Sequence, residues 1–485
     1  MISLGFDSKK KKGIYQGDYF DEIREHFSVK NDAAKFSRNR FLPSRKYIIT
    51  PTGRFDPCLL SEIIKYLEKK TEYSVNKLKI DSELLKENYP SNYDWVNNIL
   101  FSNNEFHLKL KLRDYQKEIV DKCLNFGRGT VILATAGGKT LVMASLLSKI
   151  WEMDSKFKAC LIVPNLSLVE QTYSDFQDYG VPFTVSKWTG NNELNILTNV
   201  VICNSSILQS KNSNLDWMNY LDVVLVDECH HIKKSNEITK ILESCPTNHK
   251  FGFTGTLPED KIDQWTIIGK IGPIIYQRKS YELREDKHVV PAIAQVIEIS
   301  YKNKPVRTFG NVSPIENYRN EIDFLKTNTF RNDTIQKLAK NSQNNVLILV
   351  DYLDHGSILY NQLKSNLGDK EVFYIKGEVE VSDREKIRKI MEHRSNIICI
   401  AISKIFSTGI NIKNLHYIVF GGGGKSKIKI LQSIGRGLRL HSSKSTLYII
   451  DIADQFYYGI QHQLKRQEFY EQENITYQKI KINER

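Results

Sequence analysis

Short apolar runs alternate with amphipathic segments along two long stretches of the chain. In the first stretch, runs typical of buried strands occupy residues 130–133, 159–163, 200–203, 223–226 and 250–254. Patterns with a helical period lie between them, at residues 139–151 and 167–177. Strands that alternate with helices predict a parallel sheet covered by helices. We therefore expect a doubly wound α/β lobe over residues 105–285.

The same alternation returns in a second stretch, after a break at residues 286–291. Its candidate strands occupy residues 345–350, 371–375, 396–400, 417–420 and 446–450. This pattern predicts a second lobe of the same kind over residues 286–453. Residues 302–330 are polar with weak periodicity, and the pattern assigns them no element. The tail, residues 454–485, is typical of an amphipathic helix at 455–474 followed by a short strand at 475–482.

The charge balance indicates an acidic partner. The chain has 485 residues, with 69 Lys and Arg against 56 Asp and Glu, which gives a net charge of +13. Such an excess favours polyanions such as nucleic acid, although a basic surface also serves solubility alone. With 41% hydrophobic residues the chain can bury the cores of several domains.

Cysteines and apolar runs exclude several classes of protein. The seven cysteines are scattered without a C-x-x-C pair, which indicates thiols of a reducing cytosol and no zinc or iron–sulfur site. No apolar run reaches transmembrane length. The lysines at 9–12 follow the first apolar residues, which is the wrong order for a signal peptide. We expect a cytoplasmic protein without a membrane partner, and for these lysines a solvated tail is favoured over a DNA contact.

A loop of small residues follows the strand at 130–133. Residues 134–140 read Ala-Thr-Ala-Gly-Gly-Lys-Thr before a helical pattern. A strand that turns sharply into a helix aims backbone N–H groups at phosphate oxygens, and Gly137 and Gly138 allow a close approach. Lys139 can reach the β and γ phosphates, and the Thr140 hydroxyl can bind Mg²⁺.

An acidic pair follows the strand at 223–226. Asp227 is expected to emerge at the carboxyl edge of the sheet, where open α/β sheets bind ligands. There it would hold Mg²⁺, and Glu228 would orient and deprotonate an attacking water. Together with the phosphate loop, the pair predicts hydrolysis of ATP.

A second loop competes for the phosphate role. The strict phosphate-loop pattern needs glycine where this chain has Leu133. Residues 421–424 are four glycines followed by Lys425 and Ser426, also after an apolar strand. The strand after Lys139 ends in adjacent acids, whereas the strand after Lys425 ends in Asp451 and Ile452. We therefore assign the phosphate to Lys139, while a chance match in this loop remains the alternative.

Residues 432–439 read Gln-Ser-Ile-Gly-Arg-Gly-Leu-Arg and close the second lobe. Arg436 and Arg439 are three apart, so on a helix they would share one face and could act as arginine fingers. The alternative is a surface helix whose arginines contact acids. Upstream of the phosphate loop, Gln116 could bond the edge of an adenine.

Taken together, these motifs resemble those of superfamily 2 helicases. The resemblance implies two RecA-like lobes with ATP and Mg²⁺ as cofactors. It implies catalytic roles for Lys139, Glu228, Gln432, Arg436 and Arg439, a nucleotide site that includes Gln116, Gly409 and Asn411, and a metal held by Thr140 and Asp227. A further motif is expected at Thr254, Gly255 and Thr256. By the same resemblance, DNA would be held by Pro164, Asn165, Thr189, Gly190, Ser205 and Thr408, largely through its backbone.

Individual residues within the motifs distinguish the branches of this superfamily. Cys229 and His230 after the acidic pair, together with Gln432, argue against the DEAD-box RNA helicases. Residues 406–439 most resemble the recombination helicases of T-even bacteriophages. That resemblance implies action on branched duplex and single-stranded DNA, namely forks, Holliday junctions and R-loops with their RNA–DNA hybrid. It also implies recombination or replication proteins as partners, and the host cytoplasm as location if a phage encodes the chain.

Two other functions stay open. One is the motor subunit of a restriction system, although no nuclease cluster is obvious. The other is a DNA-binding clamp that is weak in catalysis, an alternative that Leu133 leaves open.

The amino-terminal region, residues 1–95, lies outside the motor. Between residues 32 and 56 it has six basic residues, no acid before Asp56, and four interleaved aromatic residues. Basic residues can follow phosphates, while aromatic rings stack on bases or pack a core, and here the core is favoured. We expect a small basic α+β domain that binds DNA.

Overall fold

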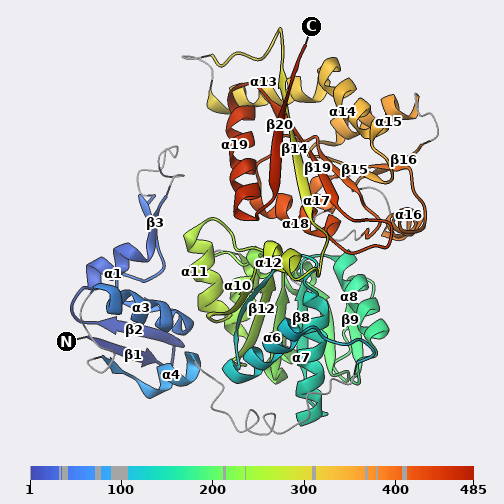
Figure 1. Cartoon of the computed structure of the whole chain (residues 1–485). Coiled ribbons are helices and arrows are strands. Elements are labelled where there is room, and N and C mark those ends of the chain that lie inside the picture. The colour runs from blue at the N-terminus through green and yellow to red at the C-terminus, as the bar shows by residue number, and fades with distance from the viewer. Residues whose placement is uncertain are drawn as a thin grey trace. The chain divides into compact units, whose positions relative to one another are not determined.

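The structure is a computed structural model that describes residues 2–31, 34, 42–70, 78–88, 108–210, 215–234, 236–308, 313–365, 370–377, 381–406 and 412–484. The chain divides into two compact units, coloured blue to green and yellow to red in Figure 1. The first comprises Met1–Leu133 and Gly138–Gln277, and the second comprises Ala134–Gly137 and Arg278–Arg485.

A sheet of seven strands in the order β13-β7-β12-β11-β8-β10-β9 forms the centre of the first unit. The strands are β7 (Gly129–Leu133), β8 (Ala159–Val163), β9 (Val185–Trp188), β10 (Val200–Asn204), β11 (Val223–Asp227), β12 (His249–Thr254) and β13 (Ile274–Arg278). From β7 to β9 all neighbours pair in parallel. The five predicted strands are confirmed. The sequence missed β9 and β13, whose polar and partly exposed residues break the apolar pattern.

Helices cover both faces of this sheet, as Figure 1 shows. They are α6 (Asp114–Phe126), α7 (Lys139–Met153), α8 (Leu166–Tyr179), α9 (Ser205–Leu208), α10 (Glu237–Ser244) and α11 (Lys261–Lys270). Every residue of β7, β8, β10 and β11 is buried. Strands covered on both faces have continuous apolar sequences, which is why their positions could be predicted. The predicted helices at 139–151 and 167–177 are confirmed as α7 and α8.

The second unit contains another sheet of seven strands, in the order β16-β17-β15-β18-β19-β14-β20. The strands are β14 (Ala292–Ser300), β15 (Val346–Val350), β16 (Glu371–Ile375), β17 (Ile397–Ile402), β18 (Tyr417–Phe420), β19 (Leu447–Asp454) and β20 (Thr476–Asn483). All pairs in it are parallel. The predicted tail strand is β20, and it completes this sheet beside β14.

Helices again accompany the strands of the second unit. They are α12 (Ser280–Glu285), α13 (Pro314–Thr327), α14 (Thr329–Asn341), α15 (Leu353–Lys364), α16 (Val381–His393), α17 (Ser403–Phe406), α18 (Lys427–Gly437) and α19 (Tyr457–Gln472). Much of the unassigned stretch at 302–330 is α13. Its buried face includes Asn317 and Glu321 beside Leu325, so hydrophobic periodicity could not reveal it. The two lobes are therefore RecA-like in topology, as expected.

The amino-terminal domain belongs to the first unit. Its sheet, in the order β5-β2-β1-β6, consists of β1 (Ser3–Asp7), β2 (Lys12–Gln16), β5 (Arg54–Phe55) and β6 (Lys79–Ile80). A hairpin of β3 (Ser28–Lys30) and β4 (Arg45–Tyr47), the helices α1 (Phe20–His26), α3 (Leu60–Lys70) and α4 (Ser82–Asn88), and the 3-10 turn η1 (Pro57–Leu59) complete it. This is the expected α+β domain. Its core also takes in Ile268 of α11, and Phe27 packs on Trp265 with ring centroids 5.2 Å apart.

The prediction of a solvated tail for the lysines at 9–12 is wrong as to the tail and as to Lys12, although Lys9, Lys10 and Lys11 are exposed. These residues form the turn between β1 and β2 and the first position of β2. The ammonium of Lys12 lies 2.5 Å from Asp56 and 3.0 Å from Glu243. A hairpin turn has no hydrophobic periodicity of its own. The run of lysines was therefore not recognised as a turn between two strands.

Among the described residues, no helix combines the length and the apolar character that crossing a membrane requires.

Candidate active site

The loop between β7 and α7 has the backbone of a phosphate cradle. The N–H of Gly137 donates to the carbonyl of Ala134 at 2.9 Å, and Ala136 and Gly138 take φ angles of 71° and 83°. The carbonyl of Gly138 accepts the N–H of Val142 at 3.0 Å, so α7 begins immediately at Lys139. The unpaired N–H groups and dipole of such a helix start favour anions.

Gln116 of α6 supports this loop. Its Oε1 accepts the backbone N–H of Arg113 at 2.9 Å, which caps the start of α6. A Cβ placed on Gly138 would lie 2.5 Å from Nε2 of Gln116, so a larger residue at this position would have to displace that amide. Gln116 is buried. The structure thus gives Gln116 a packing role against the loop, and its expected bond to an adenine stays a prediction.

Lys139 and Glu228 form an ion pair at the carboxyl edge of the sheet. Nζ of Lys139 lies 3.4 Å from Oε1 of Glu228, and their side chains are only 11% and 13% exposed. Glu228 has a φ of 49°, a left-handed conformation that costs roughly 1–3 kcal/mol for a residue other than glycine. Backbone strain of this kind is common at functional sites. The structure therefore brings Lys139 and Glu228 together, while their expected roles, in binding phosphate and as the general base, stay predictions.

Two carboxylates, those of Asp227 and Glu228, lie beside one lysine, Lys139. Asp227 ends β11 and is buried, and its Oδ1 accepts the N–H of Glu228 at 2.8 Å. Burial and the neighbouring charge of Glu228 raise the pKa of Asp227 to about 6, against the opposing effect of Lys139. A divalent cation would relieve this excess of negative charge.

The donor set fits magnesium better than a metal held by protein alone. In the part of the chain that the structure describes, no cluster of three or more His, Cys, Asp or Glu side chains could hold a metal. Mg²⁺ commonly uses one or two protein oxygens and completes its octahedron with phosphates and water. Asp227 and the hydroxyl of Thr140, the second residue of α7, supply that number of oxygens.

His230 joins the acidic pair to the end of β12. It lies in a 3-10 turn, η5 (Cys229–His231), and its Nδ1 is 2.9 Å from the Thr254 hydroxyl and 3.2 Å from Oε2 of Glu228. Thr254 also donates to the carbonyl of Thr256 at 3.0 Å. The sequence analysis identified the acidic pair and the segment at Thr254 as separate motifs. It did not predict that His230 connects them. The signal lies in the strand register, which pairs Asp227 with Phe253 and so places Thr254 one step beyond.

The residues expected to hold DNA follow the strands in the other half of the same edge. Pro164 and Asn165 follow β8, Thr189 and Gly190 follow β9, and Ser205 follows β10. Two of these side chains already have local partners: Asn165 caps α8 by accepting the N–H of Leu168 at 3.0 Å, and Thr189 donates to Asn192 at 2.9 Å. These two side chains thus stabilise the local loop structure, and the role of all five residues in DNA binding stays a prediction.

The second-unit arginines differ from the expectation in one respect. Arg436 lies in α18, buried, with its guanidinium 6.0 Å from the centre of the Phe406 ring. The helix ends at Gly437, so Arg439 lies beyond it and the two arginines do not share a helix face. The physical reason is that the carbonyl of Leu438 accepts the N–H of Val290 at 2.8 Å, which draws the chain away from α18. Gln432 is buried within α18.

The competing lysine loop has different electrostatics. Its glycine carbonyls face arginines: Gly421 accepts from Arg331 at 2.8 Å, and Gly424 accepts from Arg466 at 2.9 Å. Both arginines are buried in ion pairs, with Asp454 and Asp451. Asp351 also packs closely on this loop, within 2.8 Å of a Cβ placed on Gly422. Carbonyls and a carboxylate at these positions disfavour a phosphate, which supports the choice of Lys139.

Three expected residues lie outside the described residues: Thr408, Gly409 and Asn411.

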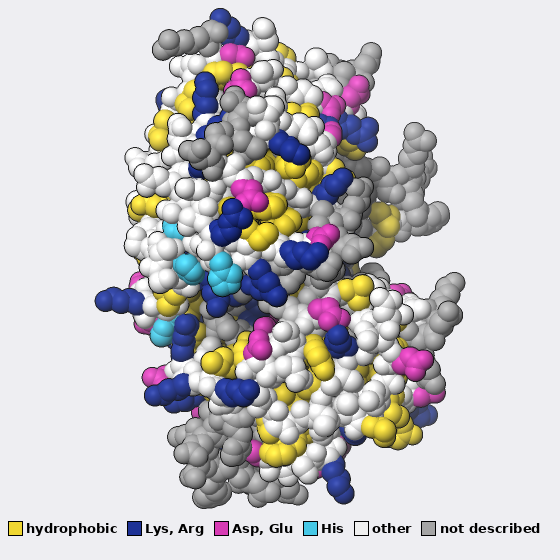
Figure 2. All heavy atoms as spheres, turned by 90° about the vertical axis from the view of Figure 1, so that its right-hand side faces the viewer, with side chains coloured by type: hydrophobic (Ala, Val, Ile, Leu, Met, Phe, Trp, Pro, Cys, Tyr) yellow, Lys and Arg dark blue, Asp and Glu magenta, His cyan; other side chains and the backbone are white. Residues whose placement is uncertain are grey.

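Figure 2 shows one face of the molecule. Basic side chains are spread over this face with acidic side chains among them, in keeping with the net charge of +13.

Comparison with known proteins places both lobes in described families. Residues 109–259 match the family "Type III restriction enzyme, res subunit", and residues 330–441 match "Helicase conserved C-terminal domain". The chain is 28% identical to the ATP-dependent DNA helicase UvsW of Enterobacteria phage T4 over 464 residues, which are 90% of this chain and 87% of that protein.

More distant relatives share the motor. The DNA 3′-5′ helicase XPB of Kineococcus radiotolerans is 21% identical over 342 residues, 68% of this chain and 57% of that protein. Among solved structures, the DUF1998 helicase MrfA bound to DNA superimposes with a TM-score of 0.55 at 15% identity, covering 80% of this chain and 52% of that one. That likeness concerns the fold.

The contact between Gly138 and Gln116 yields a prediction for Gly138→Ala. The methyl group would meet Nε2 of Gln116, and the left-handed backbone would be strained by roughly 1–3 kcal/mol. We expect nucleotide affinity to fall about tenfold or more, since about 1.4 kcal/mol corresponds to a factor of ten. Titration with a fluorescent ATP analogue measures this affinity.

Gly190→Ala is the matched control, because a Cβ on Gly190 meets nothing within 4 Å. It is expected to bind nucleotide as the unaltered protein does. Equal nucleotide affinity of both variants would contradict the assignment of this loop as the phosphate cradle.

Proposed function

Because the chain is a superfamily 2 helicase that resembles UvsW of phage T4, we propose that it hydrolyses ATP on DNA and thereby unwinds or branch-migrates forks, Holliday junctions and R-loops. The observation that carries the proposal is the group of Lys139, Asp227 and Glu228 at one edge of the first sheet. It combines a phosphate-binding cation, a metal ligand and a general base.

The ion pair of Lys139 suggests how the residues act in turn. Lys139 would leave Glu228 for the β and γ phosphates of ATP, which are stronger partners because they carry more charge. The freed carboxylate of Glu228 would then orient a water and accept its proton as the water attacks the γ phosphate. Mg²⁺, when bound, offsets charge on the phosphate oxygens.

His230 provides a route from hydrolysis to movement. It contacts both Glu228 and Thr254, so a change of partner at Glu228 would alter the hydrogen bonds at the end of β12. In the proposed cycle the two lobes close on ATP and reopen after hydrolysis, which moves the protein along the strand. Arg436 and Arg439 would supply positive charge to the γ phosphate, and Gln432, Gly409 and Asn411 would complete the nucleotide site.

DNA would run along the half of the edge that follows β8, β10 and β9. Pro164, Asn165, Thr189, Gly190, Ser205 and Thr408 are the proposed contacts, largely to the sugar–phosphate backbone and therefore sensitive to salt. The amino-terminal domain would recognise the branch. We place this activity in the cytoplasm of a phage host, with recombination or replication proteins as partners.

The proposal predicts a DNA-stimulated ATPase that depends on Lys139. Lys139→Ala removes the ammonium that binds the phosphates, so kcat is expected to fall at least about a hundredfold. Phosphate release measured with and without a forked DNA gives both the basal and the stimulated rate.

Lys425→Ala is the matched control. This exposed lysine also follows glycines, but its loop faces a carboxylate and two arginines, so its rate should stay near that of the unaltered protein. An ATPase that DNA does not stimulate, or that survives Lys139→Ala, would refute the proposal and favour a DNA-binding clamp.

The arginine fingers are tested by Arg436→Lys and Arg439→Ala. Both variants are expected to retain their affinity for DNA, measured by fluorescence anisotropy. If the arginine serves as a finger, its loss should lower the rate of ATP turnover on the order of 10³-fold. Arg394→Ala is the control, because Arg394 is 61% exposed and pairs with Glu371 at the surface. Normal hydrolysis by both finger variants would remove this assignment.

A further inference from the structure

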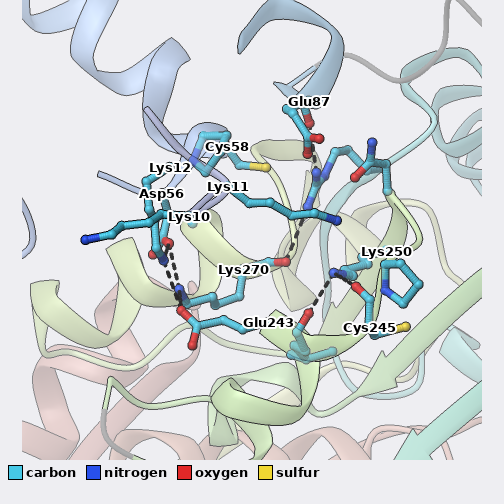
Figure 3. Close-up of a pocket in the computed structure, with 16 residues that line it drawn as sticks. Lys10, Lys11, Lys12, Asp56, Cys58, Glu87, Glu243, Cys245, Lys250 and Lys270 are labelled. Carbon is cyan, nitrogen blue, oxygen red and sulfur yellow. Dashed lines mark hydrogen bonds and ion pairs between the residues drawn. The ribbon is translucent and has the colours of Figure 1, made fainter. Parts of the chain in front are cut away.

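A cavity of about 240 Å³ lies where the amino-terminal domain meets the first RecA-like sheet (Figure 3). Both parts belong to the same compact unit. The turn between β1 and β2 brings Lys10, Lys11 and Lys12 to it from one side, and β12 brings Lys250 from the other. The proposed function uses none of these residues.

One part of the cavity is electrically balanced. Oδ1 of Asp56 lies 2.6 Å from Nζ of Lys270 and 2.5 Å from Nζ of Lys12. The same two ammonium groups lie 2.5 and 3.0 Å from Oε1 of Glu243. Burial opposes the charge on Asp56, but Lys270 and Lys12 hold the pKa of this carboxyl below its usual value. Two lysines and two carboxylates therefore neutralise each other and join the domain to α10 and α11.

The other part is not balanced. Arg128 is 5% exposed, and its guanidinium donates to the backbone carbonyls of Ile271 and Glu87, both at 2.8 Å, and of Lys270 at 3.3 Å. Lys250 is 7% exposed and donates to the carbonyls of Leu242 at 2.7 Å and Cys245 at 2.9 Å. Neither forms a salt bridge with a carboxylate among the described residues.

Buried cations that lack a counterion are costly for a fold. Burial lowers the pKa of Lys250 to about 8, because loss of solvent penalises the charged form. The lining as a whole has six basic side chains, at 10, 11, 12, 128, 250 and 270, against three acidic ones, at 56, 87 and 243. The cavity thus has an excess of three positive charges and room for a ligand.

We propose that this cavity binds a phosphate group, held by Lys11, Lys250 and Arg128. Ammonium and guanidinium groups are the protein donors best matched to phosphate oxygens, and a phosphate would supply the negative charge that the lining lacks. The bound group would also bridge the β1–β2 turn and β12, and so fix the amino-terminal domain on the motor.

This site is separate from the phosphate loop. Lys250 is the second residue of β12, whereas Thr254, the last, reaches the carboxyl edge where Asp227 lies. Four residues of strand at about 3.3 Å each place the two positions roughly 13 Å apart. The phosphate could come from a free anion or from a DNA strand, and the chemistry of the cavity is the same for both.

Inorganic pyrophosphate is the probe for the first source. Calorimetric titration is made on the full chain carrying Lys139→Ala, so that the phosphate loop does not contribute. In that background we expect pyrophosphate to bind, Lys11→Ser to weaken binding at least about fivefold, and Lys250→Met to weaken it further. Lys9→Ser is the matched control, because Lys9 lies in the same turn but does not line the cavity.

A 5′-phosphorylated oligonucleotide is the probe for the second source. If the phosphate belongs to DNA, Lys11→Ser but not Lys9→Ser weakens DNA binding and lowers its salt dependence, and pyrophosphate competes with the strand. Lys11 lies in an exposed turn, so its variant is informative even if Lys250→Met fails to fold. Equal binding of both probes by the Lys9 and Lys11 variants, or no binding of either probe in this cavity, would overturn the proposal. Neither result depends on ATP hydrolysis.

Discussion

The parallel register of β7, β12 and β11 is the constraint on which the candidate site depends. Thr254 pairs with Ile132, and Asp227 pairs with Phe253, so three strands far apart in sequence end at the same level. That level brings the phosphate loop, the acidic pair and Thr254 to one edge. A shift of register by one residue would turn each of these side chains to the opposite face and separate the site. Burial on both faces of the strands holds the register in place.

Charge then distinguishes this edge from similar places in the chain. At the first edge two carboxylates meet one lysine in a desolvated position, so cation and phosphate can both be accommodated. At the glycine loop of the second unit, arginines and aspartates already satisfy one another. At the cavity beside the amino-terminal domain, basic side chains outnumber acidic ones. All three places have some features of a phosphate site. They differ in the balance of positive and negative side chains, and we therefore assign a different role to each.

The sequence predicted the fold where local pattern and burial coincide. β7, β8, β10 and β11 were found because every residue in them is buried and most of these residues are apolar. The pattern failed for α13, because Asn317 and Glu321 are buried on its inner face. The motifs placed Lys139 and Glu228 at one edge, since they follow β7 and β11, which are separated only by β12 in the parallel sheet. These predictions need only the topology of a parallel sheet.

Other features needed tertiary contacts that no pattern encodes. Arg439 leaves the helix of Arg436 because Leu438 bonds to Val290, far away in sequence. Gln116 packs on Gly138, and Lys12 meets Asp56 and Glu243, through contacts of the folded chain alone. The role of His230 between Glu228 and Thr254 is likewise a result of strand register.

The central claim is that ATP hydrolysis at this edge drives separation of DNA strands, and strand displacement from a forked DNA tests it most directly. The measurement compares the unaltered chain with Glu228→Gln, which keeps the size of the side chain but cannot accept a proton. We expect displacement by the unaltered chain only with ATP, and a rate at least about a hundredfold lower for Glu228→Gln, with ATP and DNA binding retained. Equal displacement by the two proteins, or none by the unaltered chain in the presence of ATP, would contradict the account.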